Sequence, residues 1–291
     1  MDLHLLFENH SNYNLQPGDK ILVVDQKVGP VGIVFINRKE GSELTSGIYS
    51  CKTGELLLSE AEFDDIQVIQ RSCGYHGSEF YYRIIKNGKV GACSMDGTLI
   101  LEPENMDITE FVGGALIVKI NNKKYAVYSE NGEELLPPKY TKMKRERRFI
   151  IAHCGDNVSV VCDGKVLAEE VPVTKITKAC YYVLLHKERS VILISVRGMV
   201  KEFEGTARYR QGSCIEITAG NEQGIVYALD GSCIIPMGKY RSIRKKENTF
   251  VAECEDGSTI TGEITWWLPK SQRSFYMISG FLVLLLEEEI I

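Results

Sequence analysis

Apolar residues in this sequence come in short runs, and polar turn residues separate the runs. In one typical stretch, residues 115–120 form an aliphatic run, and Asn121-Asn122 follows, a pair that tolerates positive φ in a tight hairpin. A second run, residues 125–128, leads to Gly132, where glycine allows a left-handed turn. The helical period of 3.6 residues is absent. The pattern therefore predicts antiparallel strands joined by tight turns.

A third run and a shorter fourth element complete this stretch. The third run, residues 134–136, is followed by two prolines, and because proline cannot donate to a ladder the strand is expected to end or lie at an edge there. The fourth element, residues 139–143, places an aromatic and an apolar residue three positions apart. Each unit is thus predicted to be a three- to four-stranded antiparallel meander. The same spaced pair recurs as Phe63/Ile66 and Tyr240/Ile243.

Six segments of the chain align with one another on a turn glycine. Successive glycines are 43, 35, 32, 34 and 33 residues apart, so the repeat is about 35 residues long. One such unit cannot bury its own apolar face, whereas stacked units can. The chain is therefore predicted to be an all-β protein of tandem meanders. The six glycines are Gly54, Gly97, Gly132, Gly164, Gly198 and Gly231.

Two arrangements of the meanders are considered, a six- or seven-bladed β-propeller, which we favour, and an open β superhelix. Residues 1–44 are expected to supply N-terminal strands, residues 45–262 the repeats, and residues 263–291 a C-terminal segment with a final strand near residues 279–284. A unit shared between the two ends of the chain would close a ring and protect its edges.

Two places depart from the regular repeat. Gly257 is interpreted as the first hairpin turn of a degenerate unit rather than as its second. The first glycine spacing is long, and an insertion near residues 73–78 is expected to account for it.

These segments resemble the WG (or KWG) β-repeat of many bacterial proteins over residues 45–245. The pattern of that repeat combines an Asn-Gly-Lys-Trp-Gly segment with a later glycine turn and a Pro-Pro-x-Tyr ending. The resemblance implies a bacterial binding or scaffolding repeat without shared catalytic residues. The signature tryptophan is absent: Val90 and Tyr125 stand in two of its places, and Trp266 and Trp267 lie outside the pattern. The best local matches are residues 87–91, residues 130–132 with 137–140, and residues 230–231 with 235–240.

Charge and composition narrow the class of protein. The net charge of -5 gives no basic field over the whole chain, which disfavours nucleic acid and anionic lipid as general partners. Residues 1–8 are not expected to form a secretory signal, and the longest apolar run, residues 275–286, is too short to span a bilayer. Nine cysteines are never closer than eight residues apart, a spacing that offers no zinc signature and is typical of free thiols. We therefore expect a soluble cytoplasmic protein without membrane contact.

The sequence offers no catalytic, cofactor-binding or metal-binding residues. His153 and Cys154 are neighbours in an apolar run, and adjacent strand residues point to opposite faces, so they are not expected to form a dyad. The chain contains no phosphate-binding loop and no nucleophile elbow. An enzyme whose residues meet only in three dimensions stays open.

The most unusual local feature is two clusters of basic residues. Each follows the tyrosine of its unit, Tyr140 or Tyr240, so the clusters occupy equivalent places in the repeat. Equivalent loops of an array emerge on one face, and a basic rim there would steer an acidic or phosphate-bearing partner. Alternatively, the charges only keep the β array soluble and prevent edge pairing. The candidate binding residues are Lys142, Lys144, Arg145, Arg147, Arg148, Arg241, Arg244, Lys245 and Lys246.

Together these features favour a non-enzymatic interaction module whose expected partner is another protein, because repeat arrays offer broad surfaces. The alternative is a lectin-like β-propeller that binds a carbohydrate or another small ligand. It would need aromatic and amide side chains to recur in a pocket. The sequence leaves the oligomeric state open.

Overall fold

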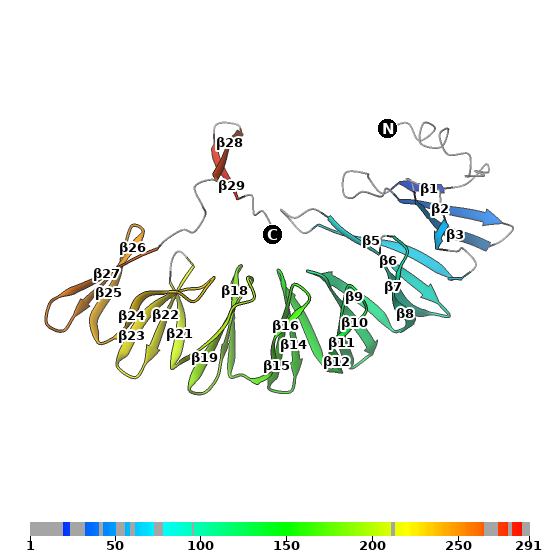
Figure 1. Ribbon diagram of the computed structural model, residues 1–291. Coiled ribbons are helices and arrows are strands. Elements are labelled where there is room, and N and C mark those ends of the chain that lie inside the picture. Colours follow the sequence, from blue (N-terminus) through cyan, green and yellow to red (C-terminus); the bar gives the residue numbers. More distant parts are fainter. Residues whose placement is uncertain are drawn as a thin grey trace. The chain divides into compact units, whose positions relative to one another are not determined.

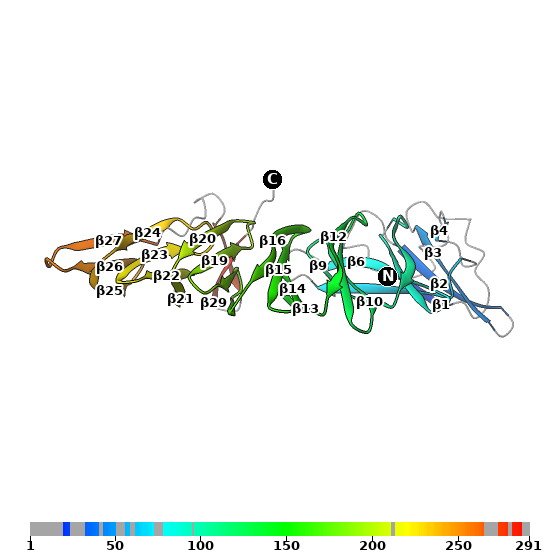
Figure 2. The ribbon, with the colours of Figure 1, turned by 90° about the horizontal axis from the view of Figure 1, so that it is seen from below.

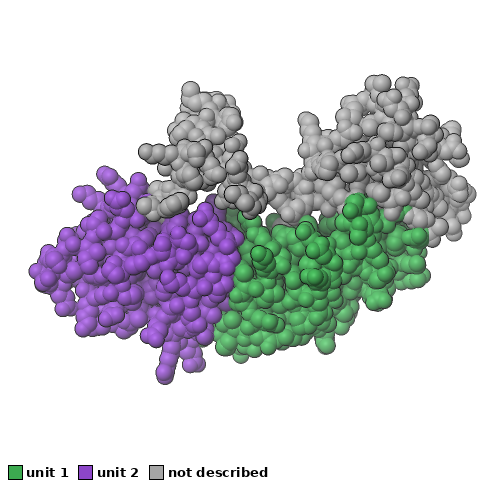
Figure 3. Space-filling view, in the orientation of Figure 1, with its two compact units in different colours: residues 1–180 green, residues 181–291 purple. Residues whose placement is uncertain are grey.

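The computed structural model describes residues 20–23, 33–40, 43–50, 56–58, 62–72, 78–94, 96–210, 213–264, 273–278 and 281–286. These residues form strands and turns and no helix (Figure 1). Two compact units divide the chain, Met1–Cys180 (unit 1) and Tyr181–Ile291 (unit 2), which are coloured separately in Figure 3. Each unit is described by itself.

Unit 1 contains the first seventeen strands. They are β1 (Lys20–Val23), β2 (Ile33–Glu40), β3 (Glu43–Ser50), β4 (Leu56–Leu58), β5 (Asp65–Ser72), β6 (Ser78–Lys86), β7 (Lys89–Cys93), β8 (Leu99–Asn105), β9 (Asp107–Val112), β10 (Ala115–Asn121), β11 (Lys124–Ser129), β12 (Glu134–Tyr140), β13 (Lys142–Glu146), β14 (Phe149–Cys154), β15 (Asn157–Cys162), β16 (Lys165–Pro172) and β17 (Lys175–Lys178).

Unit 2 contains the remaining strands. They are β18 (Tyr182–His186), β19 (Ser190–Ser195), β20 (Val200–Glu204), β21 (Thr206–Arg210), β22 (Cys214–Ala219), β23 (Glu222–Tyr227), β24 (Cys233–Gly238), β25 (Tyr240–Lys246), β26 (Thr249–Cys254), β27 (Thr259–Glu263), β28 (Arg273–Ile278) and β29 (Phe281–Leu286).

The strands form antiparallel meanders in chain order. Among the described residues there are six four-stranded sheets, one three-stranded sheet and one two-stranded sheet. Four strands in this order are also the composition of a propeller blade. The predicted all-β fold of tandem three- to four-stranded meanders is therefore confirmed. Closure into a ring stays a prediction.

The sheets begin at a different point of the repeat than the sequence predicted. The fourth element expected at residues 139–143 is not a strand of its own: Tyr140 ends β12, and Met143 lies in β13, the first strand of the next sheet. The break falls at Thr141, whose backbone N–H donates to His153 O of the next sheet at 3.0 Å. Each meander therefore starts with the segment that the sequence pattern placed last.

Strand order accounts for the first irregular place, and strand length bears on the second. Gly257 joins β26 to β27, the same connection that Gly155 makes between β14 and β15, so it is the first hairpin turn of the repeat as predicted. The long first spacing coincides with the eight-residue β5 and the nine-residue β6, which flank the expected insertion. Residues 73–77 lie outside the described residues.

A repeated bulge explains why one position of the repeat is small. In four meanders the register shifts where the fourth strand pairs with the third, and the third-strand residue opposite the shift is Gly91, Ala126, Ser159 or Gly224. A Cβ on Gly91 would lie 2.4 Å from Leu101 O. Ile192 takes this place in β19, and the β19–β20 register is regular. A larger side chain thus accompanies the loss of the bulge.

Within each unit, consecutive meanders pack face to face. In unit 1, Ile117, Leu136 and Tyr140 of one sheet pack with Ile150 and Ala152 of the next. In unit 2 the same kind of cluster joins the β21–β24 sheet to the β25–β27 sheet. Burial of such aliphatic faces is the main stabilising contribution to the array.

One buried hydrogen bond links two of these sheets. Tyr140 Oη lies 2.8 Å from Ser159 Oγ, and both side chains are fully buried. Ser159 Oγ also accepts the backbone N–H of Glu170 at 2.9 Å, which satisfies the bulge of β16. The Tyr140 ring is thus fixed at both ends, by packing and by its hydroxyl.

Replacing Tyr140 with phenylalanine is expected to lower the free energy of unfolding by about 1 kcal/mol, the usual net contribution of a buried neutral hydrogen bond. Urea denaturation followed by circular dichroism measures the loss. Tyr125→Phe, on the neighbouring strand β11, is the control and is expected to change stability by less than about 0.5 kcal/mol, as for changes away from such features. Equal losses in both variants would contradict a special role for the Tyr140 hydroxyl.

Candidate functional site

Both predicted basic clusters lie on the first strands of meanders. Lys142, Lys144 and Arg145 belong to β13, and the four residues of the second cluster belong to β25. The two clusters therefore occupy equivalent positions of the repeat, as expected, because β13 and β25 are both first strands. The expectation of loops was wrong, because only Arg147 and Arg148 lie in a turn. The two clusters belong to different units.

First strands are edge strands of their sheets. In Figure 2, β21 and β25 lie along one edge of unit 2, and β24 and β27 lie along the opposite edge. Basic residues also occur on two further first strands that the sequence reading did not single out, β17 and β21. Alternation could have identified β21, because Arg208 and Arg210 are two residues apart, as Lys142 and Lys144 are, whereas Lys175 and Lys178 of β17 are three apart. The basic feature is thus shared by the first strands β13, β17, β21 and β25.

In unit 1, cations from β13 and β17 meet at His153. Burial lowers the pKa of the His153 imidazole below its ordinary value, and the ammonium groups of Lys142, Lys178 and Lys144 lower it further. His153 is therefore neutral at neutral pH and adds no charge. We call Lys142, Lys144 and Lys178 the β13–β17 cation cluster.

Ion pairs neutralise only part of this edge. Glu146 of β13 accepts from Lys178, Glu110 of β9 lies 3.9 Å from Arg145, and Asp163 binds Arg148. Within the described part of the chain, no carboxylate lies within 4.0 Å of Lys142 or Lys144. An exposed positive charge therefore remains on the β13 side of the cluster.

In unit 2, a buried carboxylate holds two arginines of β21. Glu216 of β22 is 1% exposed and lies opposite Arg208 in the ladder. Its Oε1 accepts from Arg208 Nε at 2.6 Å and Nη2 at 2.5 Å, and its Oε2 accepts from Nε and Nη2 of Arg210, with the Nε bond at 2.6 Å. The arginine side chains remain 65% and 35% exposed. The two guanidinium groups are thus held on one side by Glu216 and remain accessible to solvent on the other.

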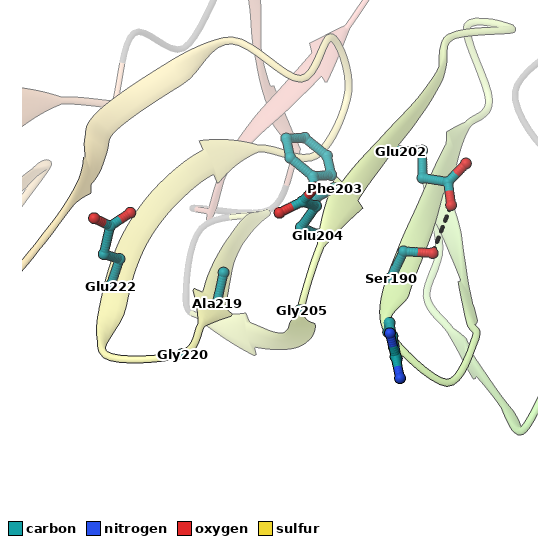
Figure 4. Close-up of a pocket in the computed structure, with 9 residues that line it drawn as sticks. Ser190, Glu202, Phe203, Glu204, Gly205, Ala219, Gly220 and Glu222 are labelled. Atoms are coloured by element: carbon teal, nitrogen blue, oxygen red, sulfur yellow. Dashed lines mark hydrogen bonds between the residues drawn. The ribbon is translucent and has the colours of Figure 1, made fainter.

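A groove of about 850 Å³ lies between two hairpin ends of unit 2. In Figure 4, Glu202 is turned toward Ser190, and Glu222 lies across the opening. Hydrogen bonds from Lys187 and Ser190 lower the pKa of Glu202 below its ordinary value, so this carboxyl is an ionised acceptor rather than a proton donor. The residues that line the groove are Arg189, Ser190, Glu202, Phe203, Glu204, Gly205, Ala219, Gly220 and Glu222.

The remaining candidates do not assemble into a site. His153 and Cys154 are consecutive in β14 and therefore lie on opposite faces of the strand, as expected. All seven described cysteines are free thiols. Burial raises the pKa of Cys93 and Cys162 to about 12 and that of Cys214 to about 11, whereas Cys180 and Cys233 are exposed. The buried thiols are therefore protonated packing residues.

No group of three His, Cys, Asp or Glu side chains in the described ranges is placed to hold a metal ion. A helix long and apolar enough to cross a membrane is not present in those ranges.

Comparisons with known proteins give structural likenesses alone. No protein-family model matches the chain, and no curated protein does. Hsv2 of Kluyveromyces lactis is 9% identical, with 63% of this chain and 70% of that chain covered and a TM-score of 0.25. BamB of Moraxella catarrhalis is 12% identical, with 86% and 87% covered and a TM-score of 0.26. PorZ of the type-IX secretion system of Porphyromonas gingivalis is 10% identical, with 79% and 41% covered and a TM-score of 0.27. Hsv2 and BamB are β-propellers. The fold described above rests on the strand pairing of this chain.

Proposed function

We propose that this protein is a non-enzymatic binding module that docks an acidic segment of another protein on its basic first-strand edge. The observation that carries the proposal is the β13–β17 cation cluster, where Lys178 alone of the three lysines has a carboxylate partner, Glu146. Like charges brought together on a rigid sheet edge repel one another, and an acidic partner removes that repulsion. The cluster lies on strands rather than loops, so its charges are held in a fixed pattern.

We further propose that the chain is a divergent cytoplasmic WG-type repeat. Supporting the repeat type is the small residue that follows the signature position in four meanders, such as Gly91 after Val90 and Ala126 after Tyr125, since these residues face the bulge of the fourth strand. Supporting the compartment are the free thiols of the seven described cysteines.

The variant Lys142→Ser/Lys144→Ser is expected to reduce recovery of a bound partner about tenfold or more. Two exposed cations are removed without touching an ion pair, so the loss reports on attraction to the partner. The measurement is affinity capture from a lysate of the source organism at 50 mM and 300 mM salt, read by quantitative mass spectrometry. Wild-type recovery is expected to fall at the higher salt, because salt screens exposed charges within about 10 Å.

The matched control is Lys123→Ser/Lys124→Ser, which removes two exposed lysines from the β10–β11 hairpin of the same unit. It is expected to recover the partner as the wild type does. If both variants lose the partner equally, net charge rather than the first-strand edge is responsible. If neither does, the proposed docking edge is wrong, and the groove of unit 2 becomes the place to look for a small ligand.

A further inference from the structure

Equivalent junctions between first strands carry different charges. Where β9 meets β13, Glu110 faces Arg145, and where β13 meets β17, Glu146 accepts from Lys178. In both, a carboxylate of one first strand meets a cation of the next. Register places Arg208 and Arg210 of β21 at the positions of Glu110 and Val112 of β9, opposite residues 216 and 214 of β22. The junction of β21 with β25 therefore has arginines where its counterpart has a carboxylate.

A further cation faces these arginines from β25. Lys245 pairs with Phe250 in the same register that places Arg145 opposite Ile150, so Lys245 is the counterpart of Arg145. Phe250 belongs to the core cluster that joins this sheet to the β21–β24 sheet. Burial raises the pKa of Cys214, and the ammonium of Lys245 opposes part of that rise, which places Lys245 close to the end of β21.

The fold does not need this arrangement. The positions equivalent to Glu216 in three other meanders hold the aliphatic residues Ile117, Ile151 and Leu184, all buried. Burying a carboxylate costs desolvation free energy even when it is paired, and aliphatic replacements are often as stable or more stable. Glu216 instead fixes two guanidinium planes at the sheet edge, with Nη1 of each arginine outside its contacts with Glu216.

We propose that Arg208, Arg210 and Lys245 bind a phosphate monoester, with Glu216 as the positioning residue. Three cations and one carboxylate leave a net charge of +2, which matches the charge of about -1.5 to -2 that a phosphate monoester carries at pH 7. A carboxylate ligand would leave the site positive. Planar guanidinium groups also present paired N–H donors to phosphate oxygens. The site uses none of the residues of the β13–β17 cation cluster, so it stands whether or not that cluster docks a protein.

The test is isothermal titration calorimetry of the full chain at pH 7.5 and low chloride. The probes are inorganic phosphate, a phosphoserine peptide and the same peptide without phosphate. Wild-type protein is expected to bind the two phosphate probes and not the unmodified peptide. Lys245→Gln and Arg208→Gln are expected to weaken binding about 10-fold or more, since a hydrogen bond to a charged group contributes about 1.5–3 kcal/mol and a factor of ten corresponds to about 1.4 kcal/mol.

Arg244→Gln is the matched control. It removes the same charge from the same strand, one residue away and therefore on the opposite face, and is expected to change the dissociation constant less than twofold. Lys245→Gln leaves both partners of Glu216 in place, so its effect cannot come from an unpaired carboxylate. Tighter binding of the phosphopeptide than of free phosphate would identify a phosphorylated protein as the source, and equal binding would identify a small phosphorylated molecule. Failure of wild type to bind either phosphate probe, or an unchanged affinity in Lys245→Gln, would overturn the proposal.

Discussion

The double variant Arg208→Ala/Arg210→Ala is expected to lower the free energy of unfolding of the protein by about 3 kcal/mol. Breaking a buried ion pair from one side costs about 3–5 kcal/mol, because the other charge stays buried without a partner. Glu216 is 1% exposed and would lose all four of its hydrogen bonds to the two guanidinium groups. We place the loss at the lower end because two truncated side chains admit water to the carboxylate.

Denaturation by urea, followed by circular dichroism, measures this loss. The same two changes combined with Glu216→Ile are expected to restore stability to within about 1 kcal/mol of wild type, because isoleucine already occupies the equivalent buried positions at 117 and 151 and replacing a buried ion pair by apolar residues is often neutral. This triple variant is expected to fold and to bind no phosphate. A double variant as stable as wild type would refute the dependence of Glu216 on the arginines.

The sequence pattern predicted the repeat because each signal that defines it is local. Tight hairpins need residues that tolerate positive φ, and the glycines at 97, 132, 164, 198 and 231 have positive φ in the structure. The run–turn–run spacing then predicted the meanders. The point in the repeat at which each sheet begins was not predictable in this way. It depends on which neighbouring strand residues 139–146 pair with, β11 for Tyr140 and β14 for residues 142–146. Thr141 separates two sheets, yet no turn residue marks the place.

The basic clusters were predictable as runs of charge, but the arginine site was not. Arg208 and Arg210 alternate with Ala207 and Tyr209, a pattern that is common on the exposed face of an edge strand. The positioning residue Glu216 lies on the next strand, β22, and the third cation, Lys245, lies on the next sheet. Only the register of β21 with β22 shows that a carboxylate lies beneath the two arginines. Aligning the meanders on register would have singled out Glu216 as the one carboxylate beside the aliphatic residues Ile117, Ile151 and Leu184 and the arginine Arg83 of β6.

Gly205→Ala is expected to lower the free energy of unfolding by about 4 kcal/mol. Gly205 connects β20 to β21 with φ +85°, and a Cβ there would lie 2.0 Å from Thr218 O of β22 and 2.8 Å from Ala219 Cα. The left-handed conformation costs a residue with a side chain about 1–2 kcal/mol, and forcing an atom into a packed site costs about 1–3 kcal/mol more. The contacts are with backbone atoms, so no side chain can turn away to relieve them.

Gly257→Ala separates the two contributions. Gly257 has φ +83°, nearly the same as Gly205, but no atom lies within 4 Å of its added Cβ. The control therefore keeps the conformational cost of about 1–2 kcal/mol and removes the clash. Urea denaturation of both variants measures the difference, which is expected to be about 2–3 kcal/mol in line with overpacking. Equal losses would mean that the β20–β21 connection moves away from Thr218 at little cost, and then the close approach of these two meanders would not be what requires glycine at position 205.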